Sequence, residues 1–252
     1  QFVYDYFGWE YPEVVHWGRI EVDGYDVPLS TSAIRERIAD GRLEGWDDPR
    51  APTLASLRRR GIRGEAVVDA MVELGVSTSN ADLSTSAIYS ANRELIDDGA
   101  TRRFLVLDGV EVPLSGAPAV GEPPRHPEHP ERGDREIPVG ESVLLEADDY
   151  PDPGERVWLK GLGCARREDG ALTYAGDDLS AVREEGVPVV HWVPARGSRP
   201  VTLRRVDGDE TGRAEPGLAE QAVDDVVQFE RVGFARVDDH ADDETVAYFA
   251  HR

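Results

Sequence analysis

Lysine, cysteine and long apolar runs are nearly missing from this sequence of 252 residues. Lys160 is the only lysine, so almost all of the 28 basic residues are arginines. Cys164 is the only cysteine, which excludes an internal disulfide and a thiolate zinc site and fits a reducing compartment. No apolar run approaches the roughly 18 residues that a membrane-spanning helix needs, and no secretory signal is visible. We therefore expect a cytoplasmic protein that does not span a membrane.

Acidic residues dominate the charge: 50 Asp and Glu against 28 basic residues leave a formal net charge of -22. Strong acidity with almost no lysine is typical of proteins adapted to molar salt, where charge repulsion is screened within about 3 Å. An acidic protein from a GC-rich genome would have a similar composition. With 40% hydrophobic residues the chain can still bury a core. Such acidity argues against nucleic-acid binding unless positive charge is concentrated locally.

Positive charge is in fact concentrated in residues 34–63. This segment holds eight arginines against five acidic residues, a local charge of +3 in a chain of -22. Three of the arginines are consecutive and follow a segment that Pro49 and Pro52 hold extended. A bound polyanion would explain this pattern, and so would a solvated helix face with charges of both signs.

The middle of the chain, residues 34–101, has the pattern of a small helical bundle. Apolar residues of helical period are bounded by Ser and Thr caps and by Gly stops. The helices are predicted over residues 33–40, 54–60, 65–74 and 86–98. The hexapeptide L-S-T-S-A-I occurs at both 29–34 and 83–88, so it can act simply as a helix cap.

From residue 102 onward the pattern changes to short strand-like runs separated by Gly, Pro and Asp, which is typical of β-barrels or sandwiches. F-L-V-L-D-G-V-E-V-P-L, residues 104–114, has Asp-Gly between two apolar runs and predicts a β-hairpin. Six prolines within residues 115–138 indicate a linker by composition. One further strand is predicted near the start, over residues 14–22.

Seven segments carry a family resemblance when they are taken together. G-W-D-D-P-R-A-P-T-L-A-S-L-R-R-R-G, residues 45–61, is the longest and most specific. The others are Y-P-E-V-V-H-W-G-R-I-E-V-D-G, P-L-S-T-S, N-R-E-L-I-D, R-H-P-E-H-P-E-R-G-D-R-E-I-P, V-V-H-W-V-P and V-V-Q-F-E-R-V-G-F. In this order they resemble the glutamyl- and glutaminyl-tRNA synthetases, in particular the archaeal glutamyl enzymes. The family's H-x-G-H motif is not in the chain, so the resemblance implies the C-terminal half of a synthetase.

The resemblance implies an α+β architecture in three parts. Residues 1–33 would be the tail of the class I catalytic domain, and residues 34–101 a helical domain at the inner corner of the tRNA. Residues 102–252 would form tandem antiparallel β-barrels, similar to a ribosomal protein barrel, that bind the anticodon. The full-length enzyme would be a glutamate–tRNA ligase that uses ATP with Mg²⁺. This chain alone would be an inactive monomer without a bound cofactor, and its partners would be the tRNAs for glutamate and glutamine.

P-L-S-T-S, residues 28–32, lies where the family carries its flexible ATP-binding loop of the K-M-S-K-S type. Activation of an amino acid needs donors and cations placed against the transferred phosphates. Ser30 and Ser32 keep the hydroxyls, whereas Thr31 and Pro28 stand where the family has lysines. The resemblance implies that Ser30, Thr31 and Ser32 contact ATP, and plain helix capping is the alternative.

The resemblance also assigns residues to tRNA. Arginine keeps its charge at any working pH and grips phosphate in a fork. Contacts with the tRNA backbone would therefore come from Arg58, Arg59 and Arg60. Unpaired anticodon bases are splayed out and read on their edges, and the implied readers are Arg135, Gln228 and Arg231. The alternative for each of these three is an exposed strand residue paired with a neighbouring acid.

Two other functions stay open on the sequence. A glutaminyl-tRNA synthetase shares this architecture, and the pocket that would distinguish the two enzymes lies in the half of the family that is missing here. A stand-alone tRNA-binding module without catalysis would share it too. No metal site is expected, since the acidic run at residues 238–244 is typical of a solvated, salt-adapted loop.

Overall fold

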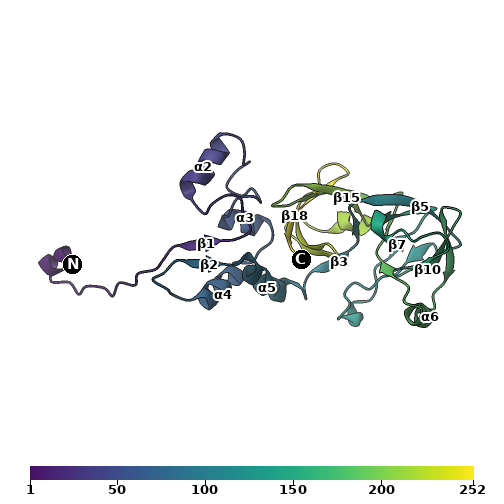
Figure 1. The fold of residues 1–252 in the computed structure, drawn as a ribbon, viewed down its shortest axis with the longest axis horizontal. Helices are drawn as coiled ribbons and strands as arrows, with labels where there is room; N and C mark the ends of the chain where they lie inside the picture. Colours follow the sequence, from purple (N-terminus) through teal and green to yellow (C-terminus); the bar gives the residue numbers. More distant parts are fainter.

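The computed structural model describes the backbone of residues 1–252 and their side chains, except those of residues 181 and 182. The molecule is elongated (Figure 1). An N-terminal arm leads to a helical part, one barrel-like sheet adjoins these helices, and a second such sheet lies at the far end. The chain runs to the far end and returns, so His251 near the C-terminus lies against Asn92 of the helical part.

The helical part agrees closely with the predicted helices. Its helices are α2 (Thr31–Ala39), α3 (Leu54–Arg59), α4 (Gly64–Leu74) and α5 (Thr85–Ile96). A further short helix, α1 (Phe2–Phe7), lies at the tip of the N-terminal arm and was not predicted. The strand predicted over residues 14–22 is confined to β1 (Ile20–Val22), which pairs in parallel with β2 (Ala81–Leu83). The residues before β1 run as an extended arm, so only the last three residues of the predicted strand find a partner strand.

The core of the helical part is continuous with the adjoining sheet. Helices α4 and α5 bury Ala66, Ala70 and Ile88 together with Phe234 and Ala250 from the C-terminal strands. Burial of apolar surface is the main stabilising term in folding. The helical part and that sheet therefore pack as one unit, while α2 has a separate small core.

Residues 101–252 form two seven-stranded sheets, named here sheet I and sheet II. Sheet I, in hydrogen-bonding order, is β12 (Val189–Val190), β9 (Arg156–Leu159), β10 (Gly163–Glu168), β11 (Ala171–Gly176), β5 (Gly109–Ser115), β8 (Ser142–Glu146) and β13 (Val193–Pro194). Sheet II, in the same sense, is β3 (Thr101–Arg103), β16 (Val226–Phe229), β17 (Gly233–Asp239), β18 (Thr245–His251), β14 (Arg199–Arg204), β15 (Glu210–Ala214) and β4 (Leu105–Val106). Sheet II is the one that adjoins the helices.

The prediction of antiparallel barrels needs a correction, because each sheet mixes two parallel pairs with four antiparallel ones. The two edge strands of each sheet are neighbours in the chain. His191 and Trp192 separate the edges of sheet I, and Phe104 alone separates those of sheet II. The covalent chain thus bridges the two edges and gives each sheet a near-barrel form, whereas a full barrel closes by hydrogen bonds.

The two sheets are internal repeats of each other. Their strands follow the same succession of parallel and antiparallel pairs. The pairs β9–β10 and β16–β17 have the same register at an offset of 70 residues: Leu159 faces Gly163, and Phe229 faces Gly233. Repeats of this kind let one position be compared with its counterpart in the other sheet.

The edge strands are exchanged between the repeats. β3 and β4 precede the first repeat but complete sheet II, and β12 and β13 precede the second repeat but complete sheet I. Phe104, between β3 and β4, places its side chain in the core of sheet I. Each sheet therefore depends on a segment that belongs in sequence to the other repeat.

The β-hairpin predicted over residues 104–114 is wrong. β4 pairs with β15 in sheet II and β5 pairs with β8 in sheet I, so the Asp-Gly turn passes between the sheets. Glu146 fixes this crossing by accepting hydrogen bonds from the N–H groups of Leu107 (2.8 Å) and Asp108 (3.0 Å).

The proline-rich residues 115–138 do not form a free linker. They include the paired strands β6 (Val120–Gly121) and β7 (Ile137–Pro138), and Ile137 is buried in the core of sheet I. The remaining short elements are η1 (Pro130–Arg132), η2 (Ala147–Asp149), α6 (Leu179–Glu184) and η3 (Pro216–Glu220).

Candidate nucleic-acid interface

The residues predicted to contact ATP lie at the start of α2. Ser30 occupies the N-cap position with an extended backbone, and Thr31 and Ser32 begin the helix. The hydroxyls of Ser30 and Ser32 lie 3.1 Å apart, and Thr31 and Ser32 are exposed. The backbone N–H groups and partial positive charge of a helix start favour anions, so this loop can meet a phosphate.

The second L-S-T-S-A-I copy, at the start of α5, has a protein partner instead. Asp23 accepts hydrogen bonds from the N–H and the hydroxyl of Thr85 (2.7 Å each) and from the Ser84 hydroxyl (3.1 Å). The hydrogen bonds from Thr85 lower the pKa of Asp23. The second copy therefore serves the fold, whereas Thr31 and Ser32 of the first copy are exposed.

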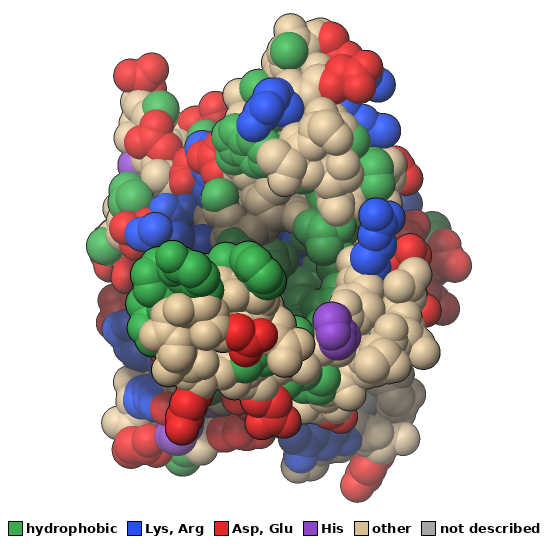
Figure 2. Space-filling view, turned by 90° about the vertical axis from the view of Figure 1, so that its left-hand side faces the viewer, with side chains coloured by type: hydrophobic (Ala, Val, Ile, Leu, Met, Phe, Trp, Pro, Cys, Tyr) green, Lys and Arg blue, Asp and Glu red, His purple; other side chains and the backbone are tan. Residues whose placement is uncertain are grey.

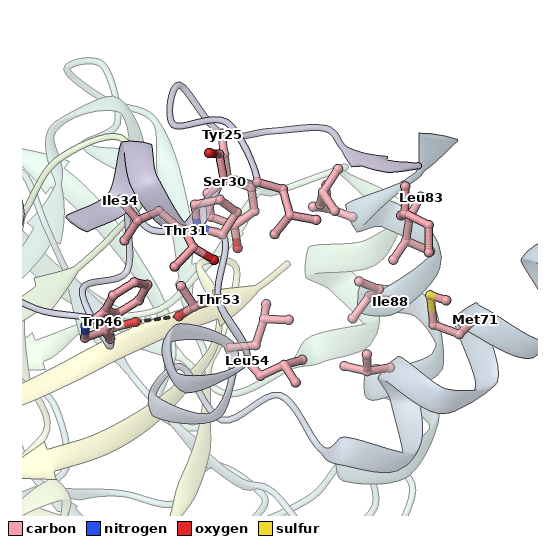
Figure 3. A pocket seen from close by; sticks show the side chains of 17 residues that line it. Tyr25, Ser30, Thr31, Ile34, Trp46, Thr53, Leu54, Met71, Leu83 and Ile88 are labelled. Atoms are coloured by element: carbon pink, nitrogen blue, oxygen red, sulfur yellow. Dashed lines mark hydrogen bonds between the residues drawn. The ribbon is translucent and has the colours of Figure 1, made fainter. Parts of the chain in front are cut away.

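A cavity of about 650 Å³ opens beside the start of α2. Seen end-on, hydrophobic side chains gather around this hollow (Figure 2). The side chains labelled on its walls are Tyr25, Ser30, Thr31, Ile34, Trp46, Thr53, Leu54, Met71, Leu83 and Ile88 (Figure 3). Thr53 fixes the wall at α3, because its hydroxyl donates to the Trp46 carbonyl and accepts the Ser56 N–H (3.0 Å). The cavity thus sets the Ser and Thr hydroxyls beside a largely apolar surface.

The three consecutive arginines have different environments. Arg58 is exposed, and its guanidinium has no partner among the described side chains. Arg59 donates to Asp47 (2.9 Å) and Asp238 (3.0 Å) and lies 4.4 Å from the centre of the Tyr248 ring. Arg59 therefore joins α3 to sheet II, and Arg58 is free to meet a phosphate.

Arg60 is 2% exposed and lies where three parts of the chain meet. Its guanidinium donates to the carbonyls of Phe249 (2.9 Å) and Ala250 in β18. It also donates to the hydroxyls of Tyr25 (3.1 Å) and of Tyr89 in α5 (2.9 Å). The predicted phosphate contact by Arg60 would require it to leave these four acceptors, so in this structure Arg60 is an internal tie.

Arg135 is likewise buried, at 2% exposure, at the junction of the two sheets. Its Nε lies 3.1 Å from both carboxylate oxygens of Glu215, and its Nη2 lies 3.1 Å from Glu230. Its guanidinium packs 4.5 Å from the centre of the Phe104 ring, and Arg103 shares Glu215 at 2.9 Å. A direct base contact by Arg135 would require it to leave two carboxylates.

Gln228 and Arg231 lie at the end of β16 and in the turn after it. Gln228 is half-buried, and the Arg231 side chain is 50% exposed on a left-handed backbone with φ 66°. The Arg231 guanidinium binds both carboxylate oxygens of Asp149 and donates to His191 Nδ1 (3.5 Å). The hydrogen bond to Asp149 raises the pKa of Arg231. Arg231 thus presents an exposed guanidinium that forms a bidentate ion pair with Asp149 when no RNA is bound.

The structure brings the three predicted anticodon residues together and separates them from the ATP loop. Glu230, between Gln228 and Arg231 in the chain, accepts a hydrogen bond from Arg135. These residues lie at the junction of sheets I and II, whereas Ser30 belongs to the helical part. The candidate interface has therefore two separate surfaces.

Several contacts at these surfaces were not visible in the sequence. Arg63 and Arg93 are exposed, and within the described part of the chain their guanidinium groups lack partners, as that of Arg58 does. The Arg63 N–H donates to Asn92 (2.8 Å), so the backbone of Arg63 lies beside the turn of α5 that carries Arg93. The positions of Arg63 and Arg93 in the sequence do not indicate that both belong to one surface. Lys160 stood out in the sequence as the only lysine, but no role was predicted for it.

The described side chains contain no cluster of three or more His, Cys, Asp or Glu residues that could hold a metal ion. Within the described residues, we also find no helix with the length and apolar character needed to cross a membrane.

The segments that match known protein families coincide with the two sheets. Two family models match, both described as the anti-codon binding domain of tRNA synthetases class I (E and Q), over residues 100–180 and 189–238. Together they cover just over half of the chain, and each match begins at the exchanged edge strands of one repeat. The chain belongs to the glutamyl- and glutaminyl-tRNA synthetase family.

Within that family the chain is close to the C-terminal region of haloarchaeal glutamate–tRNA ligases. The ligase of Natronomonas pharaonis is 62% identical over 251 residues, which cover 100% of this chain and 44% of that protein. The ligases of Haloarcula marismortui and Halobacterium salinarum are 63% and 59% identical, over 100% of this chain and 45% of each protein. The chain thus spans less than half the length of these relatives. Their haloarchaeal origin agrees with the interpretation of the acidic, lysine-poor composition as salt adaptation.

Proposed function

We propose that this chain is the tRNA-binding half of a glutamate–tRNA ligase. Residues 1–33 would complete the catalytic domain, residues 34–101 would contact the inner corner of the tRNA, and residues 102–252 would read the anticodon. One observation carries this proposal: both family matches fall on the two sheets, whose junction gathers Arg135 and Arg231 around Glu230.

Arg231 is the residue best placed to read a base. Its fork is half exposed and holds the two carboxylate oxygens of Asp149. An RNA group with two adjacent acceptors can replace Asp149, because a guanidinium binds such pairs of atoms in a fork. Gln228 offers a donor and an acceptor from the same strand end. Arg135 would support both residues from inside the junction.

Arg58, Arg63 and Arg93 would contact phosphates of the tRNA. Phosphate contacts supply affinity without sequence preference, whereas base contacts supply the preference. In molar salt, charges act only at short range, so a phosphate contact needs an exposed arginine that no acidic side chain already occupies. Arg59 and Arg60 would hold the helical part against sheet II and keep these three arginines in place.

Ser30, Thr31 and Ser32 would form part of the ATP site of the complete ligase. ATP and Mg²⁺ would act in the complete enzyme, and this chain alone would be inactive. In the complete ligase, Ser30→Ala is expected to slow ATP–pyrophosphate exchange, because a hydroxyl donor to phosphate is lost. An unchanged rate would show that the loop does not contact ATP.

The partners in this proposal are the tRNA for glutamate and the tRNA for glutamine, and the protein would be a cytoplasmic monomer. The relatives reported above are named glutamate–tRNA ligases, which favours glutamate over glutamine as the amino acid. An H-x-G-H motif encoded upstream in the same gene would exclude a stand-alone tRNA-binding module.

The direct test is a titration of this chain, in molar KCl, against two transcripts. One is the glutamate tRNA and the other is the same tRNA with its anticodon replaced. We expect tighter binding of the native transcript. Equal binding would contradict anticodon reading by this chain, and no binding to either transcript would contradict its role in tRNA binding.

A further inference from the structure

The turn after β16 has the same backbone form as the turn after β9, but the two turns carry different residues. In residues 159–162 and 229–232 the N–H of the fourth residue donates to the carbonyl of the first, at 2.9 Å and 3.0 Å. The third residue of each turn has a left-handed backbone, with φ 74° at Gly161 and 66° at Arg231. The same turn thus carries glycine in sheet I and arginine in sheet II.

Glycine is the residue expected at this position, because a left-handed backbone costs other residues roughly 1–2 kcal/mol. Gly161 also needs the space, since a β-carbon there would lie 2.3 Å from the Pro123 nitrogen. At Arg231 the fold accepts the strain and presents a half-exposed guanidinium. Residues held in such strained conformations cluster at functional sites.

Glu230 ties this strained turn to the opposite repeat. Its carboxylate accepts hydrogen bonds from Lys160 and from Nη2 of Arg135 (3.1 Å), and its N–H donates to the Arg103 carbonyl (2.9 Å). Lys160 is the second residue of the turn after β9, as Glu230 is of the turn after β16. The only lysine of the chain therefore joins equivalent positions of the two repeats.

The ion pair between Lys160 and Glu230 lies at one end of a row of alternating charges at the sheet junction. The row runs from Arg103 through Glu215, Arg135 and Glu230 to Lys160. Each carboxylate lies between two cations, and the Glu230 side chain is only 14% exposed. Removing one cation leaves its carboxylate undercompensated in a site with little water, so such a row resists rearrangement.

We propose that Lys160 and Glu230 are positioning residues for anticodon reading. Their ion pair holds the turn at residues 229–232, so that Arg231 and Gln228 meet a base at a fixed angle. This inference rests on the proposed function. When Arg231 exchanges Asp149 for RNA, Glu230 keeps its partners and the backbone of the turn stays in place.

Lys160→Met tests this, because it removes the cation and keeps a side chain of similar length. The measured quantity is the ratio of dissociation constants for the replaced-anticodon and native glutamate tRNA transcripts, in molar KCl. We expect this ratio to fall roughly tenfold, because residues that share one ion-pair network are energetically coupled by about this amount. Arg42→Met is the matched control, since it removes a cation from an exposed pair with Asp40 in the helical part and should leave the ratio unchanged.

Lys160→Arg, which keeps the cation, should retain the ratio, and Glu230→Gln should lose it as Lys160→Met does. An unchanged ratio in Lys160→Met overturns the inference. Equal loss of affinity for both transcripts also overturns it, because that outcome makes Lys160 a phosphate contact. A lack of anticodon preference in the unmodified chain would instead overturn the proposed function.

Discussion

Arg60 is a buried cation whose hydrogen-bond acceptors are all uncharged. Two are carbonyls of β18 and two are hydroxyls, those of Tyr25 and Tyr89. A buried charge is tolerated only where its donors are satisfied, and the acceptors in turn lose their partner when it is removed. Burial also raises the pKa of Tyr25, so its hydroxyl stays protonated beside the guanidinium.

Arg60→Met should therefore destabilise the chain by about 3 kcal/mol, since at least two buried acceptors lose their donor. Arg58→Met is the matched control, because the exposed Arg58 has no partner among the described residues and surface changes usually cost less than about 0.5 kcal/mol. Urea unfolding in molar KCl measures both variants. Equal stability of the two would contradict the role given to Arg60.

The sequence predicted one role for all three arginines, and the reason for their difference is geometric. Successive residues of a helix point about 100° apart, so three adjacent side chains face three directions. Which direction meets sheet II depends on Phe249, which lies 189 positions later in the chain. Local pattern predicts the helix and its Thr53 cap, but it carries no information about that distant contact.

At the scale of elements, α3 is held against sheet II by an ion-pair cluster. Asp238 of β17 accepts hydrogen bonds from Arg59 (3.0 Å) and Arg236 (2.7 Å). Burial alone would raise the pKa of Asp238, but the hydrogen bonds from Arg59 and Arg236 outweigh burial and lower it. Gly61 allows the close packing, since a β-carbon there would lie 3.1 Å from Arg236 Cβ.

A lowered carboxyl pKa gives stability that is present above the unfolded value of about 4 and is lost as pH falls through the folded value. Between about pH 6 and pH 3, the unmodified chain should thus lose more stability than Asp238→Asn, which has no proton to take up. Urea midpoints at both pH values measure the difference. Parallel losses in the two proteins would show that Asp238 is not stabilised by its arginines.

Elements were predicted well where their cause is local and poorly where it is not. The helices follow from apolar period, caps and Gly stops, and they lie near the expected residues. The hairpin failed because Asp108–Gly109 is a good turn whose flanking runs find better partners in different sheets. The three residues proposed to read the anticodon come from family resemblance alone. The pairs Lys160–Glu230 and Arg231–Asp149 form only through the packing of the two sheets, so the sequence could not indicate them.

At the scale of the whole molecule, exchanged edge strands make the two sheets dependent on each other. Phe104 lies between the edge strands of sheet II, yet its ring is fully buried in the core of sheet I. A cavity in this place removes contacts from one sheet and loosens the strand segment that completes the other. The two sheets should therefore unfold as one unit.

Phe104→Ala tests this dependence, and large-to-small changes at such sites cost about 3–5 kcal/mol. Hydrogen exchange followed by mass spectrometry should show reduced protection in both β10 and β17, although they belong to different sheets. Val157→Ala, inside the core of sheet I, is the comparison. Reduced protection confined to sheet I in Phe104→Ala would contradict coupled folding.

In the function proposed here, the helical part supplies phosphate contacts that do not depend on sequence, and the sheet junction reads the anticodon. One measurement tests it most directly: dissociation constants of Arg58→Ala and Arg231→Ala for the native and the replaced-anticodon transcript, at two KCl concentrations. We predict that Arg58→Ala weakens the binding of both transcripts equally and lowers the slope of log affinity against log salt concentration by about one. Arg231→Ala should reduce the free-energy preference for the native anticodon by about 1–3 kcal/mol. Equal weakening of both transcripts by Arg231→Ala, or a lost preference in Arg58→Ala, would contradict this division.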